Sequence, residues 1–202
     1  MRKGLLFVVS GPSGTGKGTV CNRLTEQLEI TVSISMTTRK PRVGETEGES
    51  YYFVTKEAFK EMLEQGGLLE YAEVYGNYYG TPKTKVLEKL EEGKDVLLEI
   101  DIQGALNVKK AFPDCILIFL LPPSLEELER RIVARGTETE DAIRLRLGES
   151  VRELHSVYEY DYRIVNDELQ DAVDSVASVI RSEHLRVRDD TKEFMKRYGY
   201  ER

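Results

Sequence analysis

The sequence predicts an α/β protein in which a parallel sheet, flanked by helices, carries a small mixed α/β lobe and a helical lid. Three observations predict this fold class. Short apolar runs typical of strands buried on both faces alternate with amphipathic helical stretches. A glycine-rich loop joins the first of these runs to the first helical stretch. Residues 33–92 break the alternation with turn-rich stretches and many tyrosines, which indicates an inserted lobe.

The core strands are expected at four places. Leu5–Val9 is a continuous apolar run, and Val20, Leu24 and Leu28 after it recur at the spacing of an amphipathic helix. Strand, loop and helix in this order open a βαβ unit. Three later apolar runs predict further strands of the same sheet: Val96–Ile100, Ile116–Leu121 and Tyr162–Val165.

Helices are expected between and after these strands. Ser124 with Glu127, and Thr137 with Glu140, are capping-box pairs that begin two helical stretches. The second stretch carries a long apolar stripe, made of Ile143, Leu147, Val151, Leu154 and Tyr158. A last stripe predicts one more helix: Leu169, Val173, Val176 and Ile180.

The lobe is expected to combine two short strands with two helices. The strands are expected at Val32–Ser35 and Tyr51–Val54, and the helices near 55–65 and 81–92. Val43–Gly48 and Gly76–Gly80 are rich in glycine and polar residues and are read as turns.

The boundaries of the parts follow from these elements. We expect one domain over residues 4–184, with its core at 1–32, 94–124 and 156–188. The lobe is expected at 33–93 and the lid at 125–155. Residues 189–202 form a charged C-terminal tail that is expected to dock as a helix or to fray.

The composition excludes several classes of protein. With 202 residues, of which 40% are hydrophobic and 32% charged with both signs, the chain is expected to fold. Its longest apolar runs are far shorter than the ~20 residues of a membrane span, and no signal peptide is recognised. We therefore expect a cytoplasmic protein that has no membrane partner. Two cysteines, with no CxxC pair, exclude a disulfide framework and argue against a zinc site.

The charge is unevenly distributed along the chain. A net charge of −7 argues against a nucleic-acid partner. Residues 1–43 nevertheless hold seven basic and two acidic residues, a net of +5, which leaves −12 for the rest. A positive N-terminal quarter suits a small anionic ligand bound at one place, although chance clustering of surface charge explains it equally well.

The glycine-rich loop has the P-loop pattern. Gly11, four further residues and Gly16-Lys17 stand between a buried strand and an amphipathic helix, where the motif requires them. Its backbone N–H groups and the helix N-terminus suit phosphate oxygens, and Lys17 adds a full positive charge. A strand–helix turn that binds nothing fits this context less well. The core is therefore expected to be of P-loop NTPase type, with ATP held by Gly11, Pro12, Ser13, Gly14, Thr15, Gly16, Lys17, Gly18 and Thr19.

Position 18 departs from the usual pattern, in which a serine or threonine follows the lysine. Gly18 offers no hydroxyl to a metal, so we expect Mg²⁺ to be held mainly by phosphate oxygens and water, with no direct protein ligand assigned. Thr19 is expected to donate to an inner phosphate instead. Glu99, which ends an apolar run, is a candidate for contact with Mg²⁺ through water.

Two arginines indicate a second phosphate site. Arg39 and Arg42 stand three residues apart, with Pro41 between them, and planar guanidinium groups suit a phosphate dianion. Tyr51 follows after a turn and could donate a phenolic hydrogen bond. Taken alone, however, these arginines are better read as solvated loop charges.

Six segments together resemble the guanylate kinase family, and they occur in that family's order. The resemblance covers about residues 4–184, and its Thr-Thr-Arg-x-Pro-Arg and Gly-Asn-Tyr-Tyr-Gly segments are specific to the family. The six segments are Gly11–Thr19, Ser35–Arg42, Gly48–Phe53, Gly76–Thr81, Leu98–Gly104 and Arg135–Glu140. The resemblance implies transfer of the γ-phosphoryl group of Mg-ATP to GMP, and to dGMP, which gives ADP and GDP for purine nucleotide metabolism.

The resemblance also implies a role for each residue of the acceptor site. The phosphate of GMP would be held by Arg39, Arg42, Tyr51 and Tyr79. The guanine would be held by Ser35, Glu70, Thr81 and Asp101. Carboxylates fit the ring N–H and amino donors of guanine, and hydroxyls fit its carbonyl. From the residues alone, Glu70 is better interpreted as a surface acid, and Asp101 as a helix cap.

The predicted lid carries the remaining catalytic candidates. Arg131 and Arg135 stand four apart on one helix face, and Gly136 ends that helix. The resemblance implies that Arg131, Arg135 and Arg146 act with Lys17 to neutralise charge on the transferring phosphoryl group. A surface helix pair with i,i+4 ion pairs is the alternative explanation of these arginines.

Two other functions stay open at this point. A guanylate-kinase-like binding module would lack a working phosphate loop, so Lys17 and the expectation of a single domain argue against it. A kinase for a different small phosphate acceptor is the second alternative. No oligomeric state is indicated.

Overall fold

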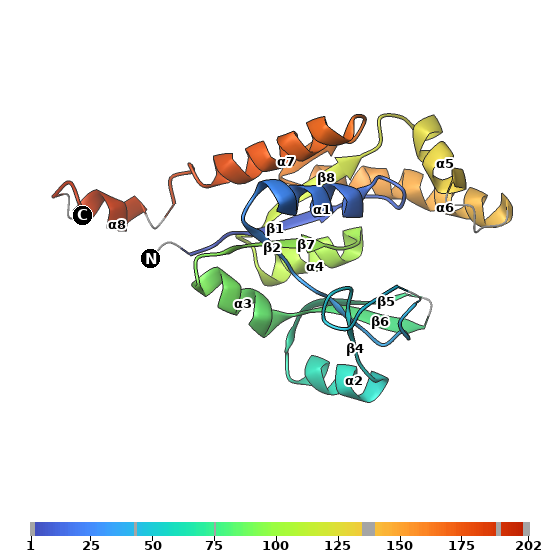
Figure 1. Cartoon of the computed structure of the whole chain (residues 1–202), viewed down its shortest axis with the longest axis horizontal. Coiled ribbons are helices and arrows are strands. Elements are labelled where there is room, and N and C mark those ends of the chain that lie inside the picture. The colour runs from blue at the N-terminus through green and yellow to red at the C-terminus, as the bar shows by residue number, and fades with distance from the viewer. Residues whose placement is uncertain (1–2, 43, 75, 135–139, 189–190, 200–202) are drawn as a thin grey trace.

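The computed structural model describes residues 3–42, 44–74, 76–134, 140–188 and 191–199, and these form two sheets with helices around them (Figure 1). The core sheet has the strand order β2-β7-β1-β8-β9, and all of its pairs are parallel. Its strands are β1 (Leu6–Ser10), β2 (Ile30–Val32), β7 (Asp95–Glu99), β8 (Ile116–Leu121) and β9 (Tyr162–Val165). The prediction of a parallel core sheet is thereby confirmed.

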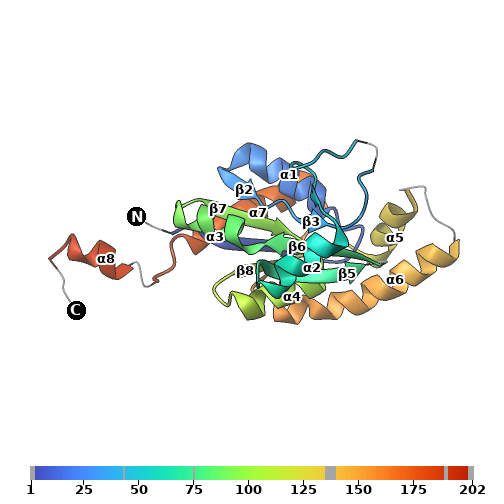
Figure 2. The ribbon, with the colours of Figure 1, turned by 90° about the horizontal axis from the view of Figure 1, so that it is seen from below.

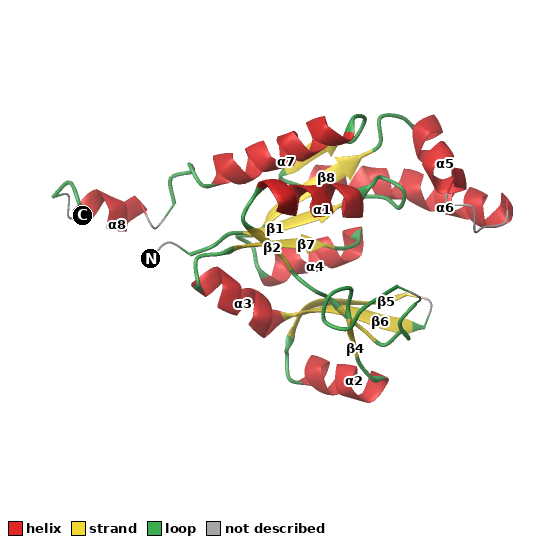
Figure 3. Ribbon diagram, viewed as in Figure 1, coloured by secondary structure: helices red, strands yellow, loops and turns green. Residues whose placement is uncertain are grey.

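Helices cover both faces of the core sheet, as the figure coloured by secondary structure shows (Figure 3). Helices α1 (Lys17–Gln27) and α7 (Leu169–Glu183) pack with Phe7 and Val9 of β1 in one cluster. Helices α3 (Lys83–Glu91) and α4 (Ile102–Ala111) pack with the alternate residues Leu6 and Val8 in the other. Because successive side chains of a strand point to opposite faces, the uninterrupted apolar run of β1 supplies both clusters.

The second sheet belongs to the inserted segment and has the order β4-β3-β6-β5. Its strands are β3 (Met36–Thr37), β4 (Tyr52–Phe53), β5 (Leu68–Val74) and β6 (Asn77–Pro82). Helix α2 (Lys56–Glu64) begins after Thr55, whose hydroxyl accepts a hydrogen bond from the Ala58 N–H at 3.2 Å. Phe59 of α2 is fully buried and stacks on Tyr78 of β6, with ring centroids 5.4 Å apart. This contact seats α2 on the sheet.

Two expectations for the lobe are wrong. The strand expected at Val32–Ser35 is absent there, because β2 ends at Val32 in the core, residues 33–35 belong to no strand, and β3 begins at Met36 in the lobe. The stretch Gly76–Gly80, read as a turn, is largely strand β6, which pairs with β5 and with β3. Cross-strand pairing thus overrides a composition that favours turns.

The region predicted to form the lid begins with a helix, and it starts where the pair Ser124 and Glu127 predicts. The Glu127 N–H donates to the Ser124 hydroxyl at 3.1 Å, and α5 (Leu125–Ala134) starts there. Helix α6 (Glu140–Leu154) and the short 3₁₀ helix η1 (His155–Glu159) follow. The apolar stripe predicted along this stretch is not a buried face throughout, because Tyr158 is 87% exposed and Val151 is also exposed.

The helices α5 and α6 lie at one end of the elongated molecule, and the C-terminal helix lies at the other (Figure 2). Helices α5 and α6 extend beyond the sheets there, and the C-terminal helix is α8 (Thr191–Lys196), the helix of the tail. The tail is thus helical at these six residues, while the expectation that it docks stays a prediction. None of the helices in the described ranges combines the length and apolar character of a membrane-crossing segment.

Candidate active site

The candidate site lies at the carboxyl edge of the core sheet. Strand β1 ends at Ser10 and leads into the P-loop, while the neighbouring strand β7 ends at Glu99 and leads into Asp101. In open α/β sheets, ligands bind in the crevice outside this edge. The order of the strands therefore brings the P-loop and the Leu98–Gly104 segment together, although about 90 residues of sequence separate them.

The backbone of the P-loop has a positive φ at three glycines, Gly11, Gly14 and Gly16. Gly16 precedes α1 in the left-handed conformation, with φ of 87°, which favours glycine. At Gly11, with φ of 149°, a Cβ would lie 2.3 Å from the Leu120 carbonyl oxygen of β8. The loop therefore follows a path that side chains would block, and its main-chain N–H groups stand at the N-terminus of α1.

The hydroxyls of the loop have different surroundings. The buried Thr15 hydroxyl donates to the Pro12 carbonyl at 2.9 Å, so it stabilises the loop from within. Ser13 and Thr19 are exposed. Of the two parts of Thr15, the side chain is thus engaged within the loop, and only the main chain is available to a nucleotide.

Lys17 lies at the first residue of α1 with its ammonium group against the loop. Its Nζ donates to the Gly11 carbonyl at 2.7 Å and to the Pro12 carbonyl at 3.1 Å. An ammonium group has three donors, so one N–H remains for a phosphate oxygen in this arrangement. Burial lowers the pKa of Lys17, and the negative charges of Glu99, Glu153 and Asp101 oppose that shift.

A pocket of about 290 Å³ joins this lysine to the predicted acceptor residues. Lys17 lines it from the P-loop side, and Glu99 and Ile100 line it from the end of β7. The other lining residues are Ser35, Tyr51, Glu70, Ala72, Tyr79, Gly80 and Asp101. The structure therefore brings together five of the eight residues that the resemblance assigned to GMP.

Two carboxylates converge on one wall of the pocket. Asp101 begins α4, where its Oδ1 accepts a hydrogen bond from the Gly104 N–H at 2.7 Å. A Cβ at Gly104 would lie 2.9 Å from Glu70 Oε2 and 3.4 Å from Asp101 Oδ1. Asp101 is thus both a helix cap and a pocket residue, since the cap uses one of its two oxygens.

Glu70 is a buried acid that is only 7% exposed. Burial, together with the nearby charge of Asp101, raises its pKa to about 7, and the hydrogen bond from Thr81 opposes that shift. The Thr81 hydroxyl donates to Glu70 Oε1 at 2.7 Å. Thr81 was expected to donate to a guanine carbonyl, but here its single donor serves Glu70. Its role in this structure is to orient that carboxylate.

Tyr51 and Tyr79 line the other end of the pocket, and Arg39 contacts both of them without lining it. Arg39 Nε donates to the Tyr79 hydroxyl at 3.2 Å, and its guanidinium lies 5.3 Å from the centre of the Tyr51 ring. Tyr51 and Tyr79 meet edge to face, with centroids 6.0 Å apart. Burial raises the pKa of Tyr51, so its phenol is a donor at neutral pH. Arg42 is exposed and does not line the pocket.

Glu99 stands beside the position where P-loops often carry a hydroxyl. A Cβ at Gly18 would lie 3.3 Å from Glu99 Oε1. Partial desolvation raises the pKa of Glu99, while the charge of Lys17 opposes the shift. Within the described ranges, no three acidic, histidine or cysteine side chains gather as a protein-only metal site would require. The Glu99 carboxylate thus lies next to position 18, where other P-loops carry a serine or threonine hydroxyl.

The lid arginines are described only in part. Arg131 Nε donates to Glu127 Oε1 at 2.7 Å, and its NH1 donates to the Asn166 carbonyl at 3.0 Å. Its i,i+4 pair with Glu127 is the contact expected of a surface helix, whereas the bond to Asn166 reaches the end of β9. Arg135 and the side chain of Arg146 lie outside the described residues.

Two polar residues near the site were not predicted from the sequence. Glu45 binds Arg39 through both carboxylate oxygens, at 2.8 Å each. Asn166 donates from its side-chain amide to the Thr15 carbonyl at 2.8 Å. Glu45 has no local signal in its turn-rich stretch. Asn166 directly follows a strand at the carboxyl edge, and that position was a usable signal.

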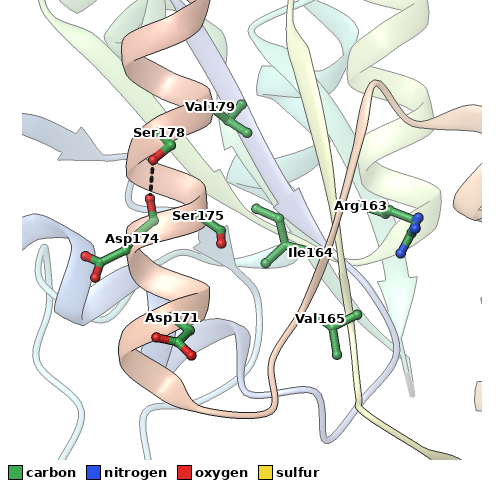
Figure 4. A pocket seen from close by; sticks show the side chains of 8 residues that line it. All are labelled: Arg163, Ile164, Val165, Asp171, Asp174, Ser175, Ser178 and Val179. Atoms are coloured by element: carbon green, nitrogen blue, oxygen red, sulfur yellow. Dashed lines mark hydrogen bonds between the residues drawn. The ribbon is translucent and has the colours of Figure 1, made fainter.

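A second hollow of about 750 Å³ lies along the sheet edge between β9 and α7 (Figure 4). Asp171 and Asp174 line it from α7, while Ile164 points toward the helix from β9. Ser178 uses its hydroxyl within the helix, donating to the Asp174 carbonyl at 2.8 Å. Two carboxylates and no phosphate loop make this groove a poor site for a nucleotide.

Comparisons with known proteins agree on one family. The family model described as guanylate kinase matches residues 3–183. The chain is 55% identical to a guanylate kinase of Clostridium tetani over 93% of its own length and 90% of that protein. It is 51% identical to a guanylate kinase of Oceanobacillus iheyensis, over 96% and 95% of the two chains. The crystal structure of a guanylate kinase from Anaplasma phagocytophilum superposes with a TM-score of 0.80 at 34% identity, covering 100% of this chain and 98% of the other. The chain belongs to the guanylate kinase family.

Proposed function

We propose that the protein transfers the γ-phosphoryl group of ATP to GMP, giving ADP and GDP. One observation carries the proposal: Lys17 of the P-loop lines the same pocket as the carboxylates Glu70 and Asp101. One cavity thus contains a phosphate-binding loop and two carboxylates that can accept hydrogen bonds from a purine base. This arrangement suits two nucleotides that face each other. The non-catalytic alternative is disfavoured, because the loop keeps its glycines and its lysine.

The acidic wall supports guanine as the base. The pairing edge of guanine presents a ring N–H and an amino group, and ionised Glu70 and Asp101 offer acceptors for both. Adenine presents a lone pair in place of the ring N–H, which a carboxylate would repel. A site with buried hydrogen-bonding groups rejects such a mismatch strongly, because the unmatched groups stay unpaired. Ser35, which lines the same pocket, is proposed to donate to the guanine carbonyl.

The other end of the pocket supports binding of the GMP phosphate. Tyr51 and Tyr79 line it and Arg39 contacts both, so that N–H and O–H donors lie together. Arg42, exposed on the same loop, is proposed to turn toward the phosphate when GMP binds. Guanidinium groups bind phosphate oxygens with two parallel hydrogen bonds, which also fixes the orientation of the acceptor.

Transfer requires positioning and charge stabilisation, without a general base. The attacking oxygen of GMP is already an anionic phosphate oxygen, so no proton must be removed from it. Lys17 is proposed to hold the outer phosphates of ATP, and Arg131, Arg135 and Arg146 to neutralise charge on the transferring group. Exclusion of water by the lid region would keep the phosphoryl group from hydrolysis.

The donor set of the site fits Mg²⁺ bound mostly through the substrate. Gly18 offers no hydroxyl, and Glu99 is the carboxylate beside it. We propose that Glu99 would hold Mg²⁺ through water while phosphate oxygens supply the direct ligands. The ion, when bound, neutralises charge on the β- and γ-phosphates of ATP.

A side-by-side assay of four acceptors tests the function. ATP consumption is measured with GMP, AMP, UMP and CMP under the same conditions, with Glu70→Gln as the matched variant. GMP is expected to be turned over at least a hundredfold more efficiently than AMP, and Glu70→Gln is expected to reduce that preference. Comparable kcat/KM values for GMP and AMP would falsify the assignment of Glu70 and Asp101 to guanine.

A further inference from the structure

Asn166 connects three elements around the part of the site that is proposed to bind ATP. Its main-chain N–H donates to the Leu121 carbonyl at the end of β8, at 2.8 Å. Its side-chain Nδ2 donates to the Thr15 carbonyl of the P-loop, also at 2.8 Å. Its own carbonyl accepts a hydrogen bond from Arg131 of α5 at 3.0 Å. The residue is only 6% exposed, so these bonds are largely shielded from water.

The side chain of Asn166 rests directly on the P-loop. A Cβ at Gly16 would lie 2.6 Å from Asn166 Nδ2, closer than any real side chain permits. The peptide between Thr15 and Gly16 is therefore held by the Asn166 amide on one side and by the start of α1 on the other. A shift of this amide would move the main-chain groups of the loop that face phosphate.

Helix α5 is fixed to the same loop. A Cβ at Gly14 would lie 3.0 Å from Leu128 Cδ1 and 3.1 Å from Ile132 Cγ1, and both of these side chains are buried. Arg131 lies between them in the sequence and binds Asn166. Three parts of the chain thus pack together: the P-loop, Asn166 after β9, and α5.

We infer that Asn166 is a positioning residue for phosphoryl transfer, which sets the P-loop peptide and the Arg131 guanidinium in one fixed relation. The inference rests on the proposed function, since it assumes that both groups act on the phosphates of ATP. Asn166 acts through Thr15 and Arg131 and needs no contact of its own with the substrate. Its amide is suited to this task because only a donor can satisfy the buried Thr15 carbonyl.

Substitution of the side chain tests the inference by the separation of kcat from KM. Asn166→Asp keeps the size but replaces the Nδ2 donor with an oxygen, and Asn166→Ala removes the group. Both variants are expected to lower kcat tenfold to a hundredfold, as small misplacements of reacting groups do. The KM for GMP should stay within about twofold, because Asn166 lies on the ATP side of the pocket. Asn22→Asp and Asn22→Ala, at an exposed position of α1, are the matched controls.

The outcomes separate positioning from mere stabilisation. Rates are measured well below the melting temperature of each variant. If Asn166→Ala does not fold, Asn166→Asp alone is used to test the inference. A lowered melting temperature with an unchanged kcat would overturn the inference. Failure of the unchanged protein to phosphorylate GMP would refute the proposed function instead, which distinguishes the two failures.

A double-mutant cycle with Arg131→Ala tests the coupling itself. Arg131 binds the main-chain carbonyl of Asn166, which the side-chain variants keep, so the coupling acts through a shift of that main chain once the amide no longer holds the loop. If this shift occurs, the substitutions at positions 166 and 131 overlap in their effects. The double variant should then be about as slow as the slower single variant. Effects that multiply would show that the two residues act independently, and would overturn the coupling.

Discussion

Glu45 binds Arg39 through both terminal nitrogens of the guanidinium group. The two bonds are 2.8 Å long, and Glu45 Oε2 also accepts the Arg42 N–H at 2.7 Å. Arg39 further donates to the Tyr79 hydroxyl and to the Lys40 carbonyl. Four of its five N–H donors are therefore used, and one remains for a phosphate. Glu45 ties the guanidinium and the loop that carries Arg42 into one arrangement.

Substitution of Glu45 is expected to weaken binding of GMP. In Glu45→Gln the bidentate ion pair with Arg39 is lost. The Arg39 side chain must then be ordered when the phosphate binds, and this ordering costs conformational entropy. The KM for GMP should rise about tenfold while kcat changes little, as steady-state kinetics with varied GMP would show. Glu49→Gln, in the same loop and exposed, is the control. A fall in KM would instead mean that Glu45 competes with the phosphate for Arg39.

The KM for GMP is expected to rise as the pH falls below 7. The pKa of Glu70 is raised to about 7 by burial, and its ionised form accepts from guanine far more strongly than the protonated form, whose O–H is itself a donor. Between pH 8 and pH 6 the ionised fraction falls about tenfold, so the KM should rise by about that factor. The hydrogen bonds from Arg39 hold the pKa of Glu45 near 2, so that residue stays ionised throughout.

The GMP phosphate also titrates, with a second pKa near 6. Its contribution is removed by comparing the protein with Glu70→Gln, because both bind the same phosphate. The ratio of the two KM values should change with pH, in favour of the unchanged protein at high pH. A ratio that is constant from pH 6 to pH 8 would remove Glu70 from base recognition.

Glu70 is also expected to lower the stability of the folded protein. Its folded pKa of about 7 lies above its ordinary value of 4.5, so the folded state binds the proton more tightly. Stability is therefore lost as the pH rises from about 4.5 through 7. Glu70→Gln should add up to about 3 kcal/mol at pH 8 and less than about 1 kcal/mol at pH 5. Thermal unfolding at the two pH values measures the difference, and an equal gain at both would contradict this origin.

Glu99 is expected to set the requirement for Mg²⁺. Glu99→Gln removes the carboxylate beside Gly18 that is proposed to hold the ion through water. The Mg²⁺ concentration for half-maximal rate should rise several-fold, with ATP held in constant excess. Gly18→Ser in the same background should restore part of the affinity, because it returns the hydroxyl that other P-loops use. An unchanged Mg²⁺ dependence in Glu99→Gln would exclude the role.

The parts that could be predicted from the sequence are those with local signals. The apolar runs placed β8 and β9 at their observed residues, and the Gly11–Lys17 spacing located the phosphate loop. For Asp101 a helix cap and a base-binding residue were alternative interpretations, and its two oxygens allow it to cap α4 while it lines the pocket.

The remainder depends on contacts between distant residues. The turn-like composition of Gly76–Gly80 gave no sign of β6, which exists because β3 and β5 flank it. Asn166 and Thr15 are 151 residues apart, and no periodicity links them. Thr81 was assigned to guanine by the resemblance, and nothing in the sequence indicates that its hydroxyl meets Glu70.

Lys17 is expected to be essential for rate but not for folding. Its ammonium group is bound to two loop carbonyls and has one donor left, so a small rotation suffices to meet a phosphate. In Lys17→Met the carbon stem is largely kept and the charge is lost, so kcat should fall about 10²- to 10³-fold, as for other removed charge-stabilising donors. Lys60→Met, on the exposed surface of α2, should leave kcat unchanged. Circular dichroism should show the same fold in both variants, and a Lys17→Met variant with normal kcat would place the source of charge stabilisation elsewhere, on the arginines.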